Sequence, residues 1–308
     1  MNAAIRSVVR SALDRGWQPL GVLNGYAGLI EGTLRPLNDR DVGGIVQRGG
    51  TILGSSRYPE LETESGQSAA IASLARAEAD AVIVIGGNGS QAGAHALAGR
   101  GARVIGVAST IDNDLAGCDV TIGATTAVDV ALEAIDRLKV TASSHHRAFL
   151  VEVMGRNCGY LALMAGIAGG AEAVAIPEVP ASVAAVADAV RDAYRRGKAH
   201  ALIVVAEGCA GGSTQLAADL AAHHADVGFD VRVTRIGHIQ RGGAPNAFDR
   251  ILASRSGAAA IEALAHDRTG IMVGIAGGKI CETSLAEVVG RIKPIDATMF
   301  ELARILAR

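Results

Sequence analysis

Val107-Ala-Ser-Thr-Ile-Asp-Asn-Asp114 places a hydroxyl and two carboxylates directly after an apolar run. That run, residues 104–107, is typical of a buried strand, and the polar side chains follow where the strand should end. In open parallel α/β sheets, ligands bind beyond the carboxyl ends of the strands, which makes Thr110, Asp112 and Asp114 candidate functional residues. A polar strand-to-loop transition whose Asp side chains cap a helix accounts for this segment equally well when it is taken alone.

Apolar runs alternate with helix-patterned segments along the whole chain. Residues 81–85 have no polar face, as expected for a strand that helices cover on both sides. Repeated alternation of strand and helix predicts parallel sheets joined by right-handed crossovers. We expect helices at residues 2–15, 68–79, 91–98, 125–142, 160–168, 183–195, 215–222 and 247–265. We expect strands at residues 20–23, 81–85, 104–107, 148–154, 173–176, 202–206, 231–236 and 271–275.

The composition excludes several classes of protein. The chain has 308 residues and a net charge of −2, so it lacks the basic character that nucleic-acid binding usually needs. No window approaches the ~18 uninterrupted apolar residues of a membrane helix, and residues 1–6 lack the pattern of a secretory signal. The four cysteines have no metal-binding spacing, which argues against zinc and disulfides and fits a reducing cytoplasm. We expect a cytoplasmic α/β enzyme without a nucleic-acid or membrane partner.

Further polar groups follow other expected strands. Gly86-Gly-Asn-Gly-Ser90 joins a strand to a helix, and the free N–H groups of a helix start favour phosphate, although many such turns bind nothing. Guanidinium groups suit phosphate because they bind its oxygens bidentately, while a surface ion pair is the ordinary alternative for any single arginine. Together these features indicate phosphoryl transfer to a sugar or polyol hydroxyl. The basic residues at or just before the strand ends are Arg57, Arg147, Arg156, Arg232, His238 and Arg241.

Four motif strings are spread along the chain, and the second and fourth of them are highly specific. They are Gly25-Tyr-Ala-Gly-Leu-Ile30, Thr110-Ile-Asp-Asn-Asp114, Val151-Glu-Val-Met-Gly-Arg156 and Gly237-His-Ile-Gln-Arg-Gly-Gly243. By these strings the chain closely resembles the 6-phosphofructokinase family, bacterial ATP-dependent type, and the matching segments span nearly the whole chain in the family's order. The resemblance implies transfer of a phosphoryl group from ATP to the 1-hydroxyl of fructose 6-phosphate, a step of glycolysis. The alternative is a catalytically weak or inactive paralogue that acts as a regulatory subunit binding sugar phosphate or effector.

The resemblance also implies roles for individual residues. Asp112 matches the catalytic base, Thr110 and Arg156 match residues at the transferring phosphoryl group, and Arg57 matches one that neutralises its charge. Asn88 and Asp114 match the Mg²⁺ site. The implied ATP contacts are Arg57, Tyr58, Gly87, Asn88, Gly89, Ser90 and Gly93. The implied fructose 6-phosphate contacts are Thr110, Asp112, Met154, Gly155, Arg156, Glu207, His238 and Arg241, with Arg147 and Arg232 reaching in from a neighbouring subunit of a homotetramer.

A second implied pocket would bind an allosteric effector, either a nucleoside diphosphate or phosphoenolpyruvate. From the residues alone its members read as solvated helix ends. They are Arg6, Arg10, Lys139, Glu172, Lys198 and His200.

Two departures from the family pattern fall on the nucleotide side. The family's first strand and its Gly-Gly-Asp-x-Pro-Gly loop have no counterpart ahead of the helix at residues 2–15, so we expect this lobe to lack one strand. The family's metal-binding Asp is Asn88, whose amide brings no negative charge, so we expect weaker Mg²⁺ binding. Gly89 and Ser109 are small where pyrophosphate-using members carry an acid and a lysine, which favours ATP as the donor.

The expected fold is two doubly wound, Rossmann-like lobes with mainly parallel sheets and the active site in the cleft between them. Residues 1–123 plus 240–285 are expected to form the nucleotide-binding lobe. Residues 124–239 plus 286–308 are expected to form the sugar-phosphate-binding lobe.

Overall fold

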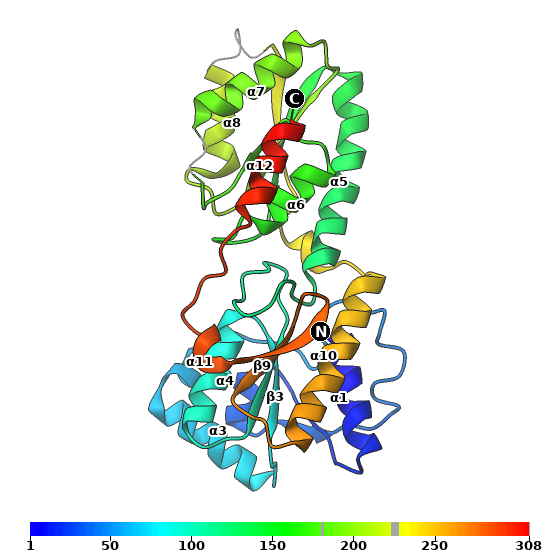
Figure 1. The fold of residues 1–308 in the computed structure, drawn as a ribbon, viewed down its shortest axis with the longest axis vertical. Helices are drawn as coiled ribbons and strands as arrows, with labels where there is room; N and C mark the ends of the chain where they lie inside the picture. The colour runs from blue at the N-terminus through cyan, green and yellow to red at the C-terminus, as the bar shows by residue number, and fades with distance from the viewer. Residues whose placement is uncertain (180–181, 223–227, 308) are drawn as a thin grey trace. The chain divides into compact units, whose positions relative to one another are not determined.

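The computed structural model describes residues 1–179, 182–222 and 228–307. The chain divides into two compact units, each with its own sheet (Figure 1). Unit 1 comprises Met1–Thr110, Asp114–Gly123 and Ala244–Lys293, and unit 2 comprises Ile111–Asn113, Ala124–Gly243 and Pro294–Arg308. In the described part of the chain, no helix is long and apolar enough to cross a membrane.

Unit 1 contains a four-stranded sheet in the order β10-β9-β4-β3. The strands β3 (Val82–Gly86), β4 (Val104–Ala108) and β9 (Ile271–Ala276) are parallel, and they confirm the expected strands to within about a residue. The strand β10 (Lys279–Ser284) was not expected and runs antiparallel to β9. Gly277 and Gly278 join these two strands and both have positive φ angles. Positive φ at both central residues is typical of a type I′ hairpin turn.

Helices cover both faces of this sheet because successive residues of β4 point to opposite sides. Ile105 and Val107 pack with residues of α1 (Asn2–Asp14) and α10 (Ala247–Ala265). Val104 and Ala108 pack with residues of α3 (Glu64–Arg76), α4 (Asn88–Gly99) and α11 (Leu285–Val288) on the other face (Figure 1). The remaining elements of unit 1 are β1 (Leu20–Val22), α2 (Tyr26–Glu31), β2 (Leu34–Pro36) and the 3₁₀ helix η1 (Pro59–Glu62).

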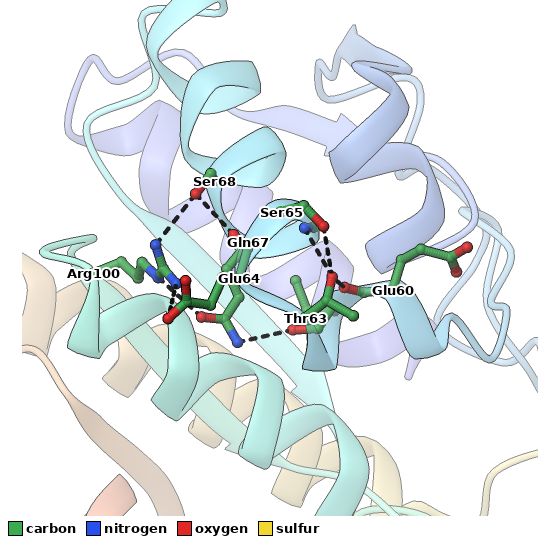
Figure 2. Close-up of polar contacts among 9 residues, drawn as sticks. Glu60, Thr63, Glu64, Ser65, Gln67, Ser68 and Arg100 are labelled. Carbon is green, nitrogen blue, oxygen red and sulfur yellow. Dashed lines mark hydrogen bonds and ion pairs between the residues drawn. The ribbon is translucent and has the colours of Figure 1, made fainter.

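The helix α3 begins four residues earlier than the sequence pattern predicts because Thr63 caps it. The Thr63 hydroxyl accepts a hydrogen bond from the Gly66 N–H at 3.1 Å, which satisfies one of the free donors of the first turn. Figure 2 shows this start together with Arg100, which follows the last residue of α4 and donates to Gln67 and Ser68 of α3. The two helices are therefore tied together at one end.

Unit 2 contains an all-parallel sheet in the order β6-β7-β5-β8. All four of its strands were expected, and each follows a helix in the chain. This arrangement confirms the predicted α/β fold with mainly parallel sheets. The strands are β5 (Arg147–Val153), β6 (Ala173–Ala175), β7 (Ala201–Ala206) and β8 (Asp230–Arg235). The helices are α5 (Ala124–Ser144), α6 (Tyr160–Ala168), α7 (Val183–Arg195), α8 (Gly212–Ala222), η2 (Gly237–Arg241) and α12 (Ala297–Leu306).

Two short segments lie in a different unit from the one that the sequence predicts. Residues 240–243 lie in unit 2, because the Gln240 side chain accepts from the Met154 N–H at 2.7 Å and donates to the Ala127 carbonyl at 3.3 Å. Residues 286–293 lie in unit 1, where Val288 is fully buried in the core and Lys293 donates to the Asp119 carbonyl.

Candidate active site

The turn after β3 forms the start of α4. The helix begins at Asn88, three residues earlier than expected, so Asn88, Gly89 and Ser90 occupy its first turn. Gly87 precedes it and provides no side-chain cap, which leaves N–H groups of this turn available for an anionic ligand. Gly86 has to be glycine, because a Cβ there would lie 2.3 Å from the Ser90 hydroxyl.

The predicted contact Gly93 lies one turn further along α4 and is packed against protein atoms. A Cβ at Gly93 would lie 2.6 Å from ring atoms of Tyr26 and from a methyl group of Leu61. The Tyr26 hydroxyl donates to the Ser90 carbonyl at 2.6 Å, and burial raises the pKa of this phenol. Tyr26 thus supports the turn through its bond to Ser90. It was not among the predicted site residues, although it belongs to the string 25–30 quoted above.

The stretch after β4 meets this turn. The Ser109 N–H donates to the Gly86 carbonyl at 3.1 Å, and a Cβ at Gly87 would lie only 3.2 Å from the Thr110 Cβ. The Thr110 carbonyl accepts from the Thr121 hydroxyl at 2.7 Å. The structure therefore brings the predicted phosphate-binding turn and Thr110 into direct contact.

Two carboxylates follow Thr110, of which Asp112 is buried and Asp114 is half-buried. Asp112 is 5% exposed and lies in the short segment Ile111–Asn113, where the chain passes from unit 1 to unit 2 and back. Asn113 has φ +53°, a left-handed conformation that Asn adopts more readily than most residues. The Oδ1 atom of Asp114 is buried and has no hydrogen-bond partner. A buried carboxylate oxygen in this state suits a cation.

Arg57 and Tyr58 lie on the segment that leads from Gly54 into η1. Arg57 is exposed and Tyr58 is half-buried. The segment is held at its start, where the Ser56 hydroxyl donates to the Asn24 carbonyl at 2.8 Å. It is held at its end by the capped start of α3 (Figure 2).

Six predicted sugar-phosphate contacts gather at the carboxyl edge of the unit 2 sheet. Met154 follows β5, and its N–H donates to Gln240 of η2. The Arg156 N–H donates to Glu207, which follows β7, at 3.0 Å. Gly155 has φ +139°, and a Cβ there would lie 2.3 Å from the Cys158 carbonyl, so no other residue fits this turn. His238 and Arg241 are exposed on η2.

Gln240 is the residue that joins these segments, and it was not predicted. It is 1% exposed and connects η2 to β5 and α5 through its two hydrogen bonds. The signal was present in the string Gly237-His-Ile-Gln-Arg-Gly-Gly243, where Gln240 lies between the two predicted phosphate contacts.

Arg147 and Arg232 lie elsewhere on this sheet. Arg147 begins β5, roughly 20 Å from the Met154 end at about 3.3 Å per residue. Both guanidinium groups pair with Asp230, at 3.8 Å from Arg147 and 2.6 Å from Arg232. One chain does not bring them to the other sugar-phosphate contacts.

Four of the six predicted effector residues lie together in unit 2. The Lys198 ammonium donates to Glu172 at 2.8 Å, and the second oxygen of Glu172 accepts from the Leu202 N–H at 2.6 Å. His200 hydrogen-bonds the Ser143 hydroxyl at 2.8 Å, and its pKa is lowered chiefly by burial, against the opposing effect of Glu172. The positive charge of Lys139 also lowers the pKa of His200. Arg6 and Arg10 belong to α1 of unit 1, where Arg10 pairs with Asp39 at 3.6 Å.

The fold defines an α/β protein with mainly parallel sheets, and a helix start and basic side chains lie at the ends of its strands. The phosphofructokinase family model matches residues 1–264. The chain is 50% identical to the ATP-dependent 6-phosphofructokinase 1 of Thermus thermophilus, over 100% of this chain and 95% of the relative. It is 46% identical to an ATP-dependent 6-phosphofructokinase of Listeria monocytogenes, with the same coverage. The chain belongs to the phosphofructokinase family.

Solved structures agree with this assignment. The phosphofructokinase of Pichia pastoris in the T-state superimposes with a TM-score of 0.89 at 35% identity, covering 94% of this chain. This chain spans about a third of that longer chain, 34% of its length. The pyrophosphate-dependent phosphofructokinase of Marinobacter aquaeolei has a TM-score of 0.83 at 24% identity, which supports the fold alone. These relatives give no support to the alternative of an inactive paralogue.

Proposed function

We propose that this protein transfers the γ-phosphoryl group of ATP to the 1-hydroxyl of fructose 6-phosphate. The observation that carries the proposal is the contact of the Gly86–Ser90 turn with Thr110, two residues before the buried Asp112. Phosphoryl transfer depends on positioning and on neutralising charge, and a helix start and a carboxylate are groups that can supply these effects. The full-length similarity to ATP-dependent 6-phosphofructokinases specifies the substrates.

Each ligand has its own set of residues in this proposal. In unit 1, N–H groups at the start of α4 bind phosphate oxygens of ATP, and the exposed Arg57 offsets their charge. In unit 2, Glu207 and Met154 contact the sugar, and His238 and Arg241 bind its 6-phosphate. Arg147 and Arg232 complete such a site in a neighbouring subunit of a homotetramer.

Asp112 acts as the base in this mechanism. Its carboxylate accepts the proton of the sugar 1-hydroxyl as that oxygen attacks the γ-phosphorus, and Thr110 and Arg156 bind the transferring group. A positioned base typically contributes ~10²–10⁴-fold to the rate. The low exposure of Asp112 keeps competing water away from the carboxylate.

Asp114, in the stretch after β4, and Asn88, at the start of α4, carry oxygens that suit Mg²⁺. The unpartnered Oδ1 of Asp114 supplies a charged oxygen and Asn88 supplies a neutral one, which is a weak but suitable oxygen pair for this ion. The ion neutralises charge on the phosphates when it is bound. The Glu172–Lys198 cluster supports an effector site for a nucleoside diphosphate or phosphoenolpyruvate, and we place the enzyme in the cytoplasm.

A coupled assay with the purified protein tests the function. We expect fructose 6-phosphate-dependent conversion of ATP to ADP, with a slower reaction when pyrophosphate replaces ATP. Asp112→Ser should lower kcat by ~10²-fold or more while calorimetry still detects binding of fructose 6-phosphate. Asp80→Ser, which removes an exposed carboxylate at the opposite end of β3, serves as the matched control. Equal activity of the Asp112 variant and the wild type would exclude this role for Asp112.

A further inference from the structure

Gln91 lies completely buried in the first turns of α4, just after the Gly86–Ser90 turn, and belongs to none of the ligand sets above. It is 0% exposed, and its Nε2 donates to the Gly86 carbonyl at 2.9 Å and to the Val107 carbonyl at 3.3 Å. Gly86 ends β3 just before the phosphate-binding turn, and Val107 precedes the stretch that carries Thr110. One carboxamide therefore joins the ends of β3 and β4. The Gly86–Ser90 turn follows the first of these strands, and the stretch Ser109–Thr110 follows the second.

The backbone leaves a space for this carboxamide. A Cβ at Gly106 would lie 2.0 Å from the Oε1 of Gln91, so the side chain fills the volume that a β4 residue would otherwise occupy. The orientation of the amide is set by its partners, because a flipped amide would direct its oxygen at two carbonyl oxygens. The correct orientation leaves Oε1 buried without a hydrogen-bond partner.

An unpaired buried oxygen is costly, and an apolar side chain of similar size would avoid that cost. The cost indicates that the two hydrogen bonds from Nε2 serve the geometry of the strand ends. The Gly86 carbonyl also accepts from the Ser109 N–H at 3.1 Å, so the same atom anchors both the helix side chain and the neighbouring strand. A loss of Gln91 would leave only the Ser109 bond and the parallel pairing of β3 with β4 to hold this junction.

We propose that Gln91 is a positioning residue for phosphoryl transfer, which sets the separation between the turn Gly86–Ser90 and the stretch Ser109–Thr110. The proposal rests on the function proposed above. Gln91 touches neither substrate; it holds the helix start that binds the donor phosphates at a constant distance from Thr110. Small displacements at a phosphoryl-transfer site reduce kcat more than they reduce binding, because alignment matters most in the transition state.

The first test replaces the carboxamide with a side chain of equal length. Gln91→Met removes both hydrogen bonds and keeps most of the volume. We expect kcat to fall ~10-fold or more, with the KM values of ATP and fructose 6-phosphate within about threefold of the wild type. Gln67→Met is the matched control, because Gln67 of α3 also donates to a backbone carbonyl, that of Leu61 at 3.1 Å, away from the strand ends (Figure 2). An equal, small change of kcat in both variants would overturn the proposal.

A second test displaces the carboxamide without changing Gln91. Gly106→Ala places a methyl group where Oε1 lies and should lower kcat in the same way. In a Gln91→Ala background the same methyl group has room, so the two substitutions together should lower kcat by clearly less than the product of their separate effects. Multiplicative effects would show that Gly106 and Gln91 act independently and would contradict the proposal.

Hydrogen exchange separates this proposal from the proposed function, because it needs no turnover. In Gln91→Met, amides of residues 86–90 and 107–110 should exchange about 10-fold faster than in the wild type, while those of unit 2 stay unchanged. Unchanged exchange in both segments would refute the positioning role even in an active enzyme. A wild-type protein without kinase activity would refute the proposed function and leave the exchange result to decide on Gln91.

Discussion

Gly87 and Thr110 touch across the ends of two neighbouring parallel strands. A methyl group at Gly87 would lie 3.2 Å from the Thr110 Cβ and 3.8 Å from the Ser109 carbonyl. This spacing is too short for any larger residue unless one of the two loops moves. The same built Cβ would lie 3.5 Å from the Thr110 hydroxyl oxygen, so the start of α4 and this hydroxyl are near each other, which suits the binding of a transferring phosphoryl group.

Gly87→Ala should therefore lower kcat/KM for ATP, by roughly 10-fold for a displacement of a few tenths of an ångström. The backbone of Gly87 is extended, with φ −89°, so alanine causes no strain of its own, and the melting temperature should stay within a few degrees. Gly99→Ala, at the end of the same helix with open space around it, is the control. Steady-state kinetics at varied ATP concentration make the comparison, and equal values for both variants would contradict it.

Asn88→Asp should strengthen Mg²⁺ binding. The substitution adds a carboxylate to the proposed site, to which the unpartnered Asp114 oxygen also belongs, and hard cations prefer charged oxygen ligands. We expect the Mg²⁺ concentration that gives half-maximal activity to fall by about 10-fold. Ala92→Asp adds the same charge at an exposed position one turn further along α4 and should have little effect. A response of both variants to the same degree would indicate a general charge effect.

The stability of unit 1 should fall at high pH because of Cys118. Burial raises the pKa of this thiol to about 11, against 9.0 for the ordinary thiol. Between these values the unfolded chain has lost the proton and the folded chain has kept it, so the free energy of unfolding declines as the pH rises. The slope is about 1.4 kcal/mol per pH unit for one thiol.

Urea unfolding between pH 8 and pH 11 measures this effect as a difference between the wild type and Cys118→Ala. Other groups that titrate in this window contribute equally to both proteins. The wild-type curve should fall more steeply above pH 9, and the two should run parallel below it. Parallel curves throughout would show that the thiol ionises as readily in the folded protein as in the unfolded chain.

Glu172→Gln should weaken both the effector response and the stability of unit 2. Glu172 is 5% exposed and accepts from Lys198 and from the Leu202 N–H, and hydrogen bonds to a buried charged group contribute about 1.5–3 kcal/mol. Glu133→Gln removes a carboxylate whose pair with Arg137 is exposed, so its effect should stay below about 1 kcal/mol. Denaturant unfolding and the shift of the fructose 6-phosphate saturation curve by ADP provide the two measurements. An unchanged shift in Glu172→Gln would remove this residue from the effector site.

The sequence alone predicts the parallel strands of both sheets well but misses the antiparallel strand β10. Residues 104–107 and 202–206 are continuous apolar runs, because helices cover both faces of the strands they form. The strand β10 is hard to predict because none of its residues is buried. Its residues are exposed or half-buried, and the three exposed ones are charged or polar. The glycine pair at 277–278 was the available signal for its hairpin.

The sequence likewise supplies one part of the candidate site and misses another. Motif strings supplied the residues that we propose to face ligands, and these roles stay predictions. They did not identify Gln91 or Gln240, two buried amides whose importance lies in the carbonyl and N–H groups they connect. A glutamine in a helix pattern looks like any surface glutamine until the backbone groups around it have positions.

For this protein, local sequence determined the order of strands and helices and the residue types at the strand ends, since these depend on periodicity and on short motifs. Tertiary structure alone decided which strand ends touch. Gly87 meets Thr110 and Gln240 meets Met154 only because parallel strands distant in the chain end at the same edge of a sheet. Arg147 and Asp230, 83 positions apart, pair at the opposite end of the sheet for the same reason.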